Sequence, residues 1–203
     1  NIARNLEKIS YPDENNTAEY FSVKYSMPLW IVEQWLADYG KEQTEQILQS
    51  FYLERPTTIR VNENRMSRAE LKKKLEEEGV TVEEHSQVAS ALLISGYDYL
   101  GALESFRNGA FQVQDAASIL VAESAGIKNG DYVIDVCAAP GGKALHAAQL
   151  LEGSGHVEAR DLTENKVELI RGNICRMGFE NVEAIQQDAT VYDAASALKA
   201  DVL

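Results

Sequence analysis

Three aspartates stand where a carboxylate could bind a ligand: Asp135, Asp161 and Asp188. Asp135 ends a short apolar run of the kind that forms a buried parallel strand, and Asp161 and Asp188 follow further predicted strands. In sheets that alternate strands with helices, ligands bind at the carboxyl ends of the strands. The spacing therefore predicts that the three carboxylates lie at such ends, in a parallel, doubly wound sheet.

The first aspartate opens a turn of small residues. Residues 132–143 read Tyr-Val-Ile-Asp-Val-Cys-Ala-Ala-Pro-Gly-Gly-Lys, and a helix is predicted to follow from Ala144 to Leu151. The adjacent glycines lack the Cβ atoms that would keep a ligand from the backbone. Strand, glycine turn and helix form a nucleotide-type cradle. The cofactor-binding residues are predicted to be Asp135, Cys137, Ala138, Ala139, Pro140, Gly141, Gly142, Lys143, Asp161 and Asp188.

Three known cradles compete for this turn. A phosphate-binding P-loop requires glycine at position 137 and Ser or Thr at position 144, but the sequence has Cys137 and Ala144 there. A dinucleotide fingerprint requires G-x-G-x-x-G, whereas these glycines are adjacent. S-adenosylmethionine is a cation without phosphate, so an acid such as Asp135 suits it electrostatically. Asp161 could then accept hydrogen bonds from both ribose hydroxyls.

Several of these residues could have a purely structural role instead of binding the cofactor. Asp135 could hold the glycine turn through its backbone amides, and Asp188 could close an Asx turn. Lys143 could approach the cofactor's carboxylate or only cover the start of its helix, where a cation opposes the helix dipole. We interpret Cys137 and Cys175 as small packing residues rather than nucleophiles.

Several motifs carry a family resemblance. Asp-Val-Cys-Ala-Ala-Pro-Gly-Gly-Lys at 135–143, Phe-Gln-Val-Gln-Asp-Ala-Ala-Ser at 111–118 and Asn-Ile-Cys-Arg-Met-Gly-Phe at 173–179 are similar to motifs of the Nop/Sun family of RNA 5-methylcytosine methyltransferases. Tyr-Ser-Met-Pro-Leu-Trp-Ile-Val at 25–32 and Arg-Pro-Thr-Thr-Ile-Arg-Val-Asn at 55–62 resemble the bacterial Sun/Fmu branch, which modifies small-subunit ribosomal RNA. The resemblance covers most of the chain from about Tyr20 to Leu203.

The resemblance implies methyl transfer from S-adenosyl-L-methionine to carbon 5 of cytosine. In this family a Cys thiolate adds to C6, which makes C5 carbanion-like before it attacks the sulfonium methyl group. The family's nucleophile and release cysteines lie in Thr-Cys and Pro-Cys motifs after the fourth strand begins, and neither motif occurs in this sequence. We therefore expect the nucleophile to lie beyond Leu203 and the 203-residue chain to be inactive by itself.

Composition is that of an ordinary globular protein, with 203 residues of which 45% are apolar. There is no run of 18 apolar residues and no signal peptide, so we expect a cytoplasmic segment of a longer protein. The two cysteines are far apart, with no His or Cys at metal-ligand spacing. Neither a disulfide framework nor a metal site is therefore expected.

A net charge of −13 argues against indiscriminate nucleic-acid binding, which requires a basic footprint. Residues 55–74, however, hold seven basic side chains against two acidic ones. This basic run either contacts ribosomal RNA or is a solvated helix face balanced by Glu76, Glu77 and Glu78. Its possible RNA contacts are Arg55, Arg60, Arg65, Arg68, Lys72, Lys73 and Lys74.

The predicted elements divide the chain into three parts. Residues 1–19 are predicted to be a linker with a short helix at 2–9, the possible end of a helical NusB-like domain by resemblance. Residues 20–110 form a small α+β domain with strands at 58–61, 80–84 and 91–95. Residues 111–203 begin a truncated Rossmann-like methyltransferase sheet, with strands at 132–135, 156–159 and 182–186 and a fourth starting at Asp201.

Single residues mark the ends of several predicted helices. Ser26 is a plausible N-cap for a helix that ends near Gly40, Ser67 opens a capping box with Glu70, and Asp115 caps the helix that precedes the glycine turn. The resemblance implies that the small domain is RNA-recognition-like, although it lacks an aromatic-rich strand that stacks bases.

Two functions from other classes compete with methyl transfer. A non-catalytic RNA-binding or assembly module would explain the missing cysteine motifs but not the cofactor turn. A nicotinamide-dependent oxidoreductase would share the cradle but lacks its glycine fingerprint.

Overall fold

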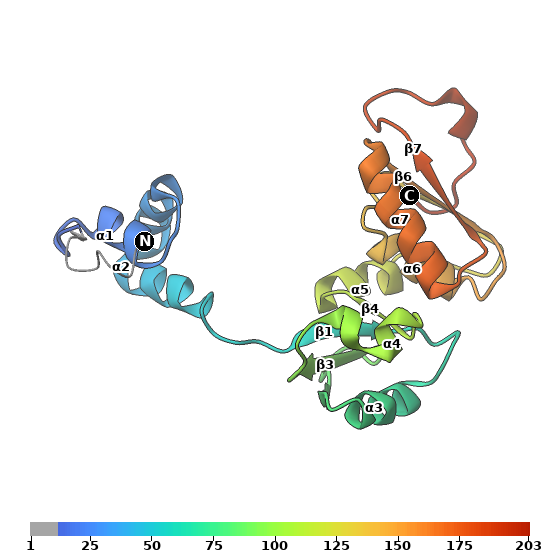
Figure 1. Ribbon diagram of the computed structural model, residues 1–203. Helices are drawn as coiled ribbons and strands as arrows, with labels where there is room; N and C mark the ends of the chain where they lie inside the picture. The colour runs from blue at the N-terminus through green and yellow to red at the C-terminus, as the bar shows by residue number, and fades with distance from the viewer. Residues whose placement is uncertain (1–11) are drawn as a thin grey trace. The chain divides into compact units, whose positions relative to one another are not determined.

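The computed structural model describes residues 12–203. The described residues divide into two compact units, with the boundary after Arg55 (Figure 1). The boundary between them lies inside the predicted 20–110 domain, and the predicted helix at 2–9 lies outside the described residues. Within residues 12–203, no helix has both the length and the apolar character needed to cross a bilayer.

The first unit contains helices α1 (Thr17–Lys24) and α2 (Leu29–Ser50). Gly40 adopts φ 75° and interrupts α2, at the position where the sequence predicts a helix end. The predicted N-cap at Ser26 is wrong, because α2 begins only after Pro28. Proline disfavours helical geometry in the residue before it, so the helix cannot start at Ser26.

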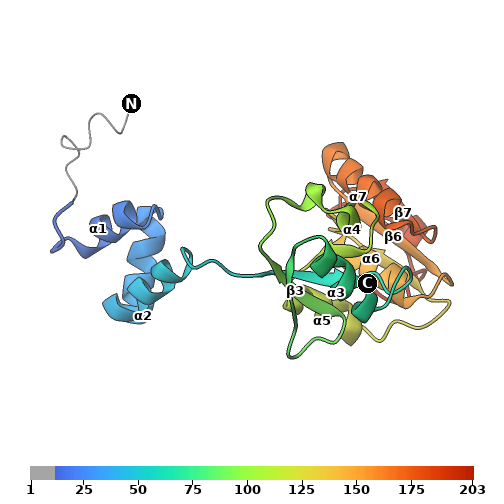
Figure 2. The ribbon, with the colours of Figure 1, turned by 60° about the horizontal axis from the view of Figure 1, so that its bottom comes forward.

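The second unit begins with a four-stranded antiparallel sheet in the order β2-β3-β1-β4. Two helices alternate with its strands in the split β-α-β-β-α-β pattern (Figure 2). The elements are β1 (Thr57–Val61), α3 (Arg68–Glu77), β2 (Thr81–Glu84), β3 (Ala91–Ser95), α4 (Glu104–Arg107) and β4 (Phe111–Val113), with a 3₁₀ turn η2 (Leu100–Ala102) before α4.

The start of α3 confirms the predicted capping box. The Ser67 side chain accepts a hydrogen bond from the Glu70 amide, and the Glu70 carboxylate accepts one from the Ser67 amide at 2.8 Å. One face of α3 then buries Leu71 and Leu75 completely against the sheet. Each such leucine contributes about 1.5 to 3 kcal/mol of burial free energy.

A second sheet has three parallel strands in the order β5-β6-β7. Val202 forms a single parallel bridge with Val133, and its carbonyl accepts from the Ile134 amide at 3.0 Å, so the chain pairs with β5 where the fourth strand is predicted to start. The strands are β5 (Tyr132–Asp135), β6 (His156–Asp161) and β7 (Val182–Gln186); the helices are α5 (Ala116–Ser124), α6 (Gly142–Leu150) and α7 (Glu164–Met177), with a 3₁₀ turn η3 (Ala194–Ser196).

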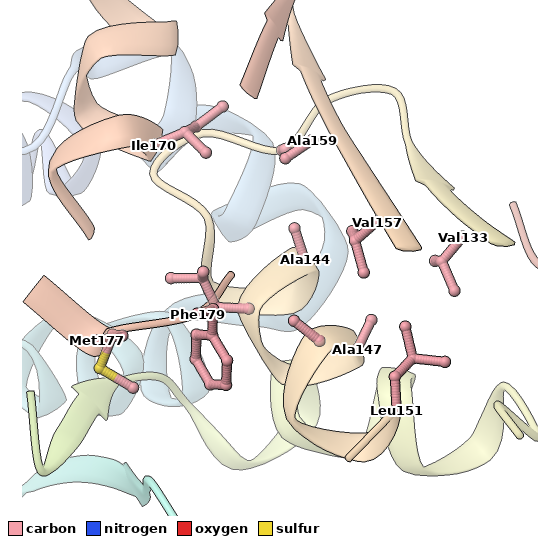
Figure 3. Close-up of a cluster of buried hydrophobic side chains, with 12 residues drawn as sticks. Val133, Ala144, Ala147, Leu151, Val157, Ala159, Ile170, Met177 and Phe179 are labelled. Carbon is pink, nitrogen blue, oxygen red and sulfur yellow. The ribbon is translucent and has the colours of Figure 1, made fainter. Parts of the chain in front are cut away.

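The core of this α/β region lies between the parallel sheet and the helices α6 and α7. Crossover connections between parallel strands are right-handed, and the connections from β5 to β6 and from β6 to β7 run in the same direction along the sheet. Helices α6 and α7 therefore cover the same face of the sheet. Figure 3 shows side chains of β5 and β6 meeting those of α6 and α7. The labelled side chains are Val133, Ala144, Ala147, Leu151, Val157, Ala159, Ile170, Met177 and Phe179, all at most 8% exposed. The Rossmann-like prediction for this region is confirmed.

Candidate cofactor site and nucleic-acid interface

The glycine turn connects β5 to α6 at the carboxyl end of the parallel sheet. Gly141 is the residue before the helix and adopts φ 106°, a left-handed conformation that favours glycine. The Ala138 amide donates to the Arg160 carbonyl at 2.8 Å, which ties the turn to β6. The strand, turn and helix that the predicted cradle requires are therefore all present.

Asp135 holds the glycine turn, which is its structural alternative, and its contact with the cofactor stays a prediction. One carboxylate oxygen, Oδ1, accepts from the Cys137 amide at 3.2 Å and so holds the turn. The other oxygen, Oδ2, is buried without a hydrogen-bond partner among the described residues. Burial raises the pKa of this carboxyl, against the opposing effects of the Cys137 amide and the Lys143 charge. Because buried polar atoms are normally paired, Oδ2 marks a place for a donor or a cation.

Asp161 is the last residue of β6 and is only 5% exposed. Its carboxylate accepts from the Ala139 amide at 3.0 Å and the Leu162 amide at 2.8 Å, and it lies 3.1 Å from the Lys166 ammonium. Burial raises the pKa of Asp161, but these donors outweigh it and hold the pKa below its usual value. The residue supports the glycine turn and keeps acceptor capacity for a ligand, since a carboxylate offers about four lone-pair sites.

Asp188 follows β7 and forms the Asx turn that is its structural alternative. Its Oδ1 accepts from the Thr190 hydroxyl at 2.7 Å and from the Thr190 amide at 2.8 Å. These two bonds hold the pKa of Asp188 below its usual range. A contact between Asp188 and the cofactor stays a prediction.

The two cysteines are both exposed, so their interpretation as packing residues is wrong. Cys137 lies beyond the last residue of β5, where the chain leaves the sheet, and Cys175 lies on the outer side of α7. Lys143 is exposed in the first turn of α6. Together with Asp135 it supplies the charged lining of an apolar cavity formed by α5, β5, α6 and residues 202–203.

The prediction that Arg60 contacts RNA is wrong, because the Arg60 side chain is completely buried. It lies on the face of β1 opposite Ile59 and Val61, and its Nε donates to Gln114 Oε1 at 2.9 Å while Nη1 donates to Gln149. Desolvation by burial lowers the pKa of Arg60 to about 10. The sequence shows the alternation of the strand but not that α6 covers its second face.

Acidic side chains partly balance the rest of the basic run. Arg68 pairs with Glu84 at 3.1 Å, Lys73 with Glu77 at 3.8 Å and Lys74 with Glu104 at 3.4 Å. Exposed pairs of this kind contribute little to stability and exchange readily with other ions. Arg65 donates to the Met177 carbonyl at 3.0 Å, which gives it a structural role as well.

Two amide side chains at the glycine turn were not predicted. Asn173 donates from Nδ2 to the Pro140 carbonyl at 2.9 Å, and the Gln114 side chain lies against Gly142. Both belong to motifs that carry the family resemblance, at 173–179 and 111–118. That membership is the one signal by which the sequence could have found them.

Two family models match the chain. Residues 27–98 match the ferredoxin-like domain of RsmF/B-like methyltransferases, and residues 122–201 match the 16S rRNA methyltransferase RsmB/F model. The chain belongs to the RsmB/F methyltransferase family. The predicted relationship to the Sun/Fmu branch is thereby confirmed.

Two curated relatives extend this result. A probable ribosomal RNA small subunit methyltransferase B of Bacillus subtilis is 36% identical over 165 residues, which cover 81% of this chain and 36% of that protein. A tRNA (cytosine(72)-C(5))-methyltransferase of Pyrococcus horikoshii is 41% identical over 90 residues, which cover 44% of this chain and 23% of that protein. The chain thus spans only about a quarter to a third of these relatives' length.

Solved structures confirm the fold. The crystal structure of PH0851 matches with a TM-score of 0.81 and 30% identity, over 95% of this chain and 44% of that one. The crystal structure of NSun6 from Pyrococcus horikoshii with SFG, an S-adenosylmethionine analogue, matches with a TM-score of 0.70 and 22% identity, over 77% of this chain and 64% of that one.

Proposed function

We propose that the full-length protein transfers a methyl group from S-adenosylmethionine to carbon 5 of a cytosine in small-subunit ribosomal RNA. In this proposal the present chain supplies the cofactor site. The observation that carries it is the buried, unpaired Asp135 Oδ2 beside a glycine turn that Asp161 holds in place. The names of the relatives, and the analogue in the NSun6 structure, support the same reaction.

The residues of the turn fit S-adenosylmethionine, which supplies an electrophilic methyl group on a sulfonium. Asp135 offers a negative charge and a free acceptor to the cationic ligand. Asp161 accepts from the ribose hydroxyls, and the backbone of residues 137–142 lies against the ligand where glycine leaves room. Lys143 and Asp135 have opposite charges, which suits the zwitterionic amino-acid end of the cofactor. Asp188 is assigned to the adenine end.

For RNA binding, we assign the exposed part of the basic run to phosphate contacts. Phosphates can replace the acidic partners of α3, because those ion pairs lie at the surface. Arg60 is excluded by its burial. We place the reaction in the cytoplasm, and we assign the RNA contacts to Arg55, Arg65, Arg68, Lys72, Lys73 and Lys74.

The nucleophile is assigned to residues outside this chain. Activation of C5 requires a thiolate over the base, on the side opposite the methyl donor. Cys137 belongs to the turn that binds the donor, and Cys175 lies on the outer surface of α7. These positions support the assignment of the nucleophile to another part of the full-length protein.

A methyl-transfer experiment tests this function. The full-length protein, its Cys137→Ala variant and the 203-residue chain are incubated with tritiated S-adenosylmethionine and unmodified small-subunit RNA. We expect 5-methylcytosine from the first two and none from the chain alone. Formation of 5-methylcytosine by the 203-residue chain alone would overturn the assignment of the nucleophile. Calorimetry that detects binding of NAD but not of S-adenosylmethionine would overturn the reaction.

A further inference from the structure

A side chain of α7 contacts the glycine turn, although the two residues that meet are 33 positions apart in the sequence. Asn173 Nδ2 donates to the Pro140 carbonyl at 2.9 Å. Apart from this bond, the turn is held by backbone and carboxylate contacts from β5 and β6. Asn173 therefore ties a second element, the helix that follows β6, to the segment that receives the cofactor.

The orientation of the Asn173 amide is set by Arg176, one turn further along α7. Arg176 donates to Asn173 Oδ1 from Nε at 3.3 Å and from Nη2 at 3.0 Å. Both arginine donors require an oxygen, so the nitrogen of the amide must point to the Pro140 carbonyl. The arginine thus removes the ambiguity that an isolated asparagine amide would have.

Arg176 also anchors this arrangement to the four-stranded sheet. Its Nη1 donates to the carbonyls of Phe106 and Phe111, each at 3.0 Å, and its Nη2 donates to Gln112. The guanidinium lies 4.1 Å from the centre of the Phe106 ring. Strand β4 and the segment before it therefore fix the Arg176 guanidinium, which in turn fixes the Asn173 amide.

The backbone of α7 is fixed at the same place. A Cβ atom on Gly109 would lie 2.0 Å from the Arg176 carbonyl oxygen, so the turn before β4 packs directly on the helix end. Asn62 donates to the carbonyls of Gly109 at 2.8 Å and Met177 at 3.1 Å. These contacts leave α7 little freedom to shift relative to the small sheet.

We propose that Asn173 is a positioning residue for cofactor binding. By donating to the Pro140 carbonyl it fixes the glycine turn in its ligand-binding shape, and through Arg176 it links that shape to the four-stranded sheet. Deformation of that sheet would then change affinity at the turn, which couples the two parts energetically. The inference rests on the proposed function only in naming S-adenosylmethionine as the ligand of the turn.

The test compares three variants of the full-length protein. Asn173→Ala removes the donor to Pro140 and the acceptor for Arg176. Asn173→Asp keeps the acceptor for Arg176, and hence the anchoring of α7, but sets a carboxylate oxygen against the Pro140 carbonyl. Asn181→Ala is a matched control, because Asn181 Nδ2 donates to the Ala148 carbonyl at 3.2 Å, away from the turn.

Two measurements are made on each variant: the Kd for S-adenosylmethionine by calorimetry, and amide hydrogen exchange of Cys137, Ala138, Ala139 and Gly141 without cofactor. Loss of one hydrogen bond corresponds to roughly three- to tenfold in affinity. We expect that weakening, with faster exchange in the turn, for both variants at position 173. The control should stay within about twofold of the parent, below the smallest effect expected from one lost bond.

Parental affinity and exchange in Asn173→Asp would overturn the proposal, because Asn173 would then serve only to hold Arg176. Parental values in Asn173→Ala would overturn it as well. If the parent itself does not bind S-adenosylmethionine, the proposed function fails. Faster exchange in both variants at position 173, but not in the control, would still support the positioning role.

Discussion

Replacing Asp161 with Asn tests the centre of the cofactor site. The native carboxylate accepts from two backbone amides and lies next to Lys166. An asparagine has a single acceptor oxygen, so either the Ala139 or the Leu162 amide must face an NH₂ group instead. A hydrogen bond to a charged group is worth about 1.5 to 3 kcal/mol. We expect Asp161→Asn to lower the free energy of unfolding by about that amount.

The same substitution removes an acceptor for the ribose hydroxyls. A loss of about 1.4 kcal/mol corresponds to tenfold in Kd, so S-adenosylmethionine should bind at least about tenfold more weakly. In a unit of roughly 150 residues the lost stability should appear as a fall in Tm of about 3 to 12 °C. Calorimetry and thermal melting of the full-length protein measure the two effects separately.

The effect of Asp161→Asn on stability should depend on pH. The pKa of Asp161 is lowered in the folded state, so its contribution to stability is fully present above the unfolded-state pKa of about 3.9 and is lost as the pH falls through the folded value. The difference in stability between parent and Asp161→Asn should therefore shrink below about pH 4.

Lys166→Met is the matched control, because it removes only an ion pair whose lysine side chain is 54% exposed. It should change stability by less than about 1 kcal/mol. Equal Tm and equal Kd for parent and Asp161→Asn would refute both roles of Asp161. A lower Tm with an unchanged Kd would refute the ribose contact alone.

Three further outcomes are expected. Reversing Lys72, Lys73 and Lys74 to Glu should lower RNA affinity and flatten its salt dependence, whereas equal salt slopes would mean that α3 is a solvated helix face. Burial, and then the charge of Arg60, lower the pKa of His146 to about 3. The parent should therefore lose stability as the pH falls from about 6.5 toward that value, by up to about 1.4 kcal/mol per pH unit, and urea unfolding of His146→Gln should lack this contribution. Cys137→Ala should bind S-adenosylmethionine within about twofold of the parent, because a backbone amide rather than the thiol holds Asp135; a loss of more than tenfold would contradict this.

The sequence by itself predicted the local features of the fold. The capping box at Ser67 and the Asp115 cap, whose side chain accepts from the Ser118 amide, were both found where predicted. Each depends on residues within one turn of one another, so local geometry is sufficient. The strand, glycine turn and helix at residues 132–150 were predicted for the same reason. The motifs also predicted the family.

Only the tertiary structure decided which side chains are exposed and which distant residues contact each other. Arg60 reads as one more cation in a basic run, yet α6 covers that face of β1 and buries it. Cys137 and Cys175 sit in apolar surroundings in the sequence, yet both are exposed. No local pattern predicts a contact between Asn173 and Pro140, because the two residues meet only when α7 packs beside the glycine turn. Periodicity shows which side of an element a residue occupies, but only the packing of distant segments determines what covers that side.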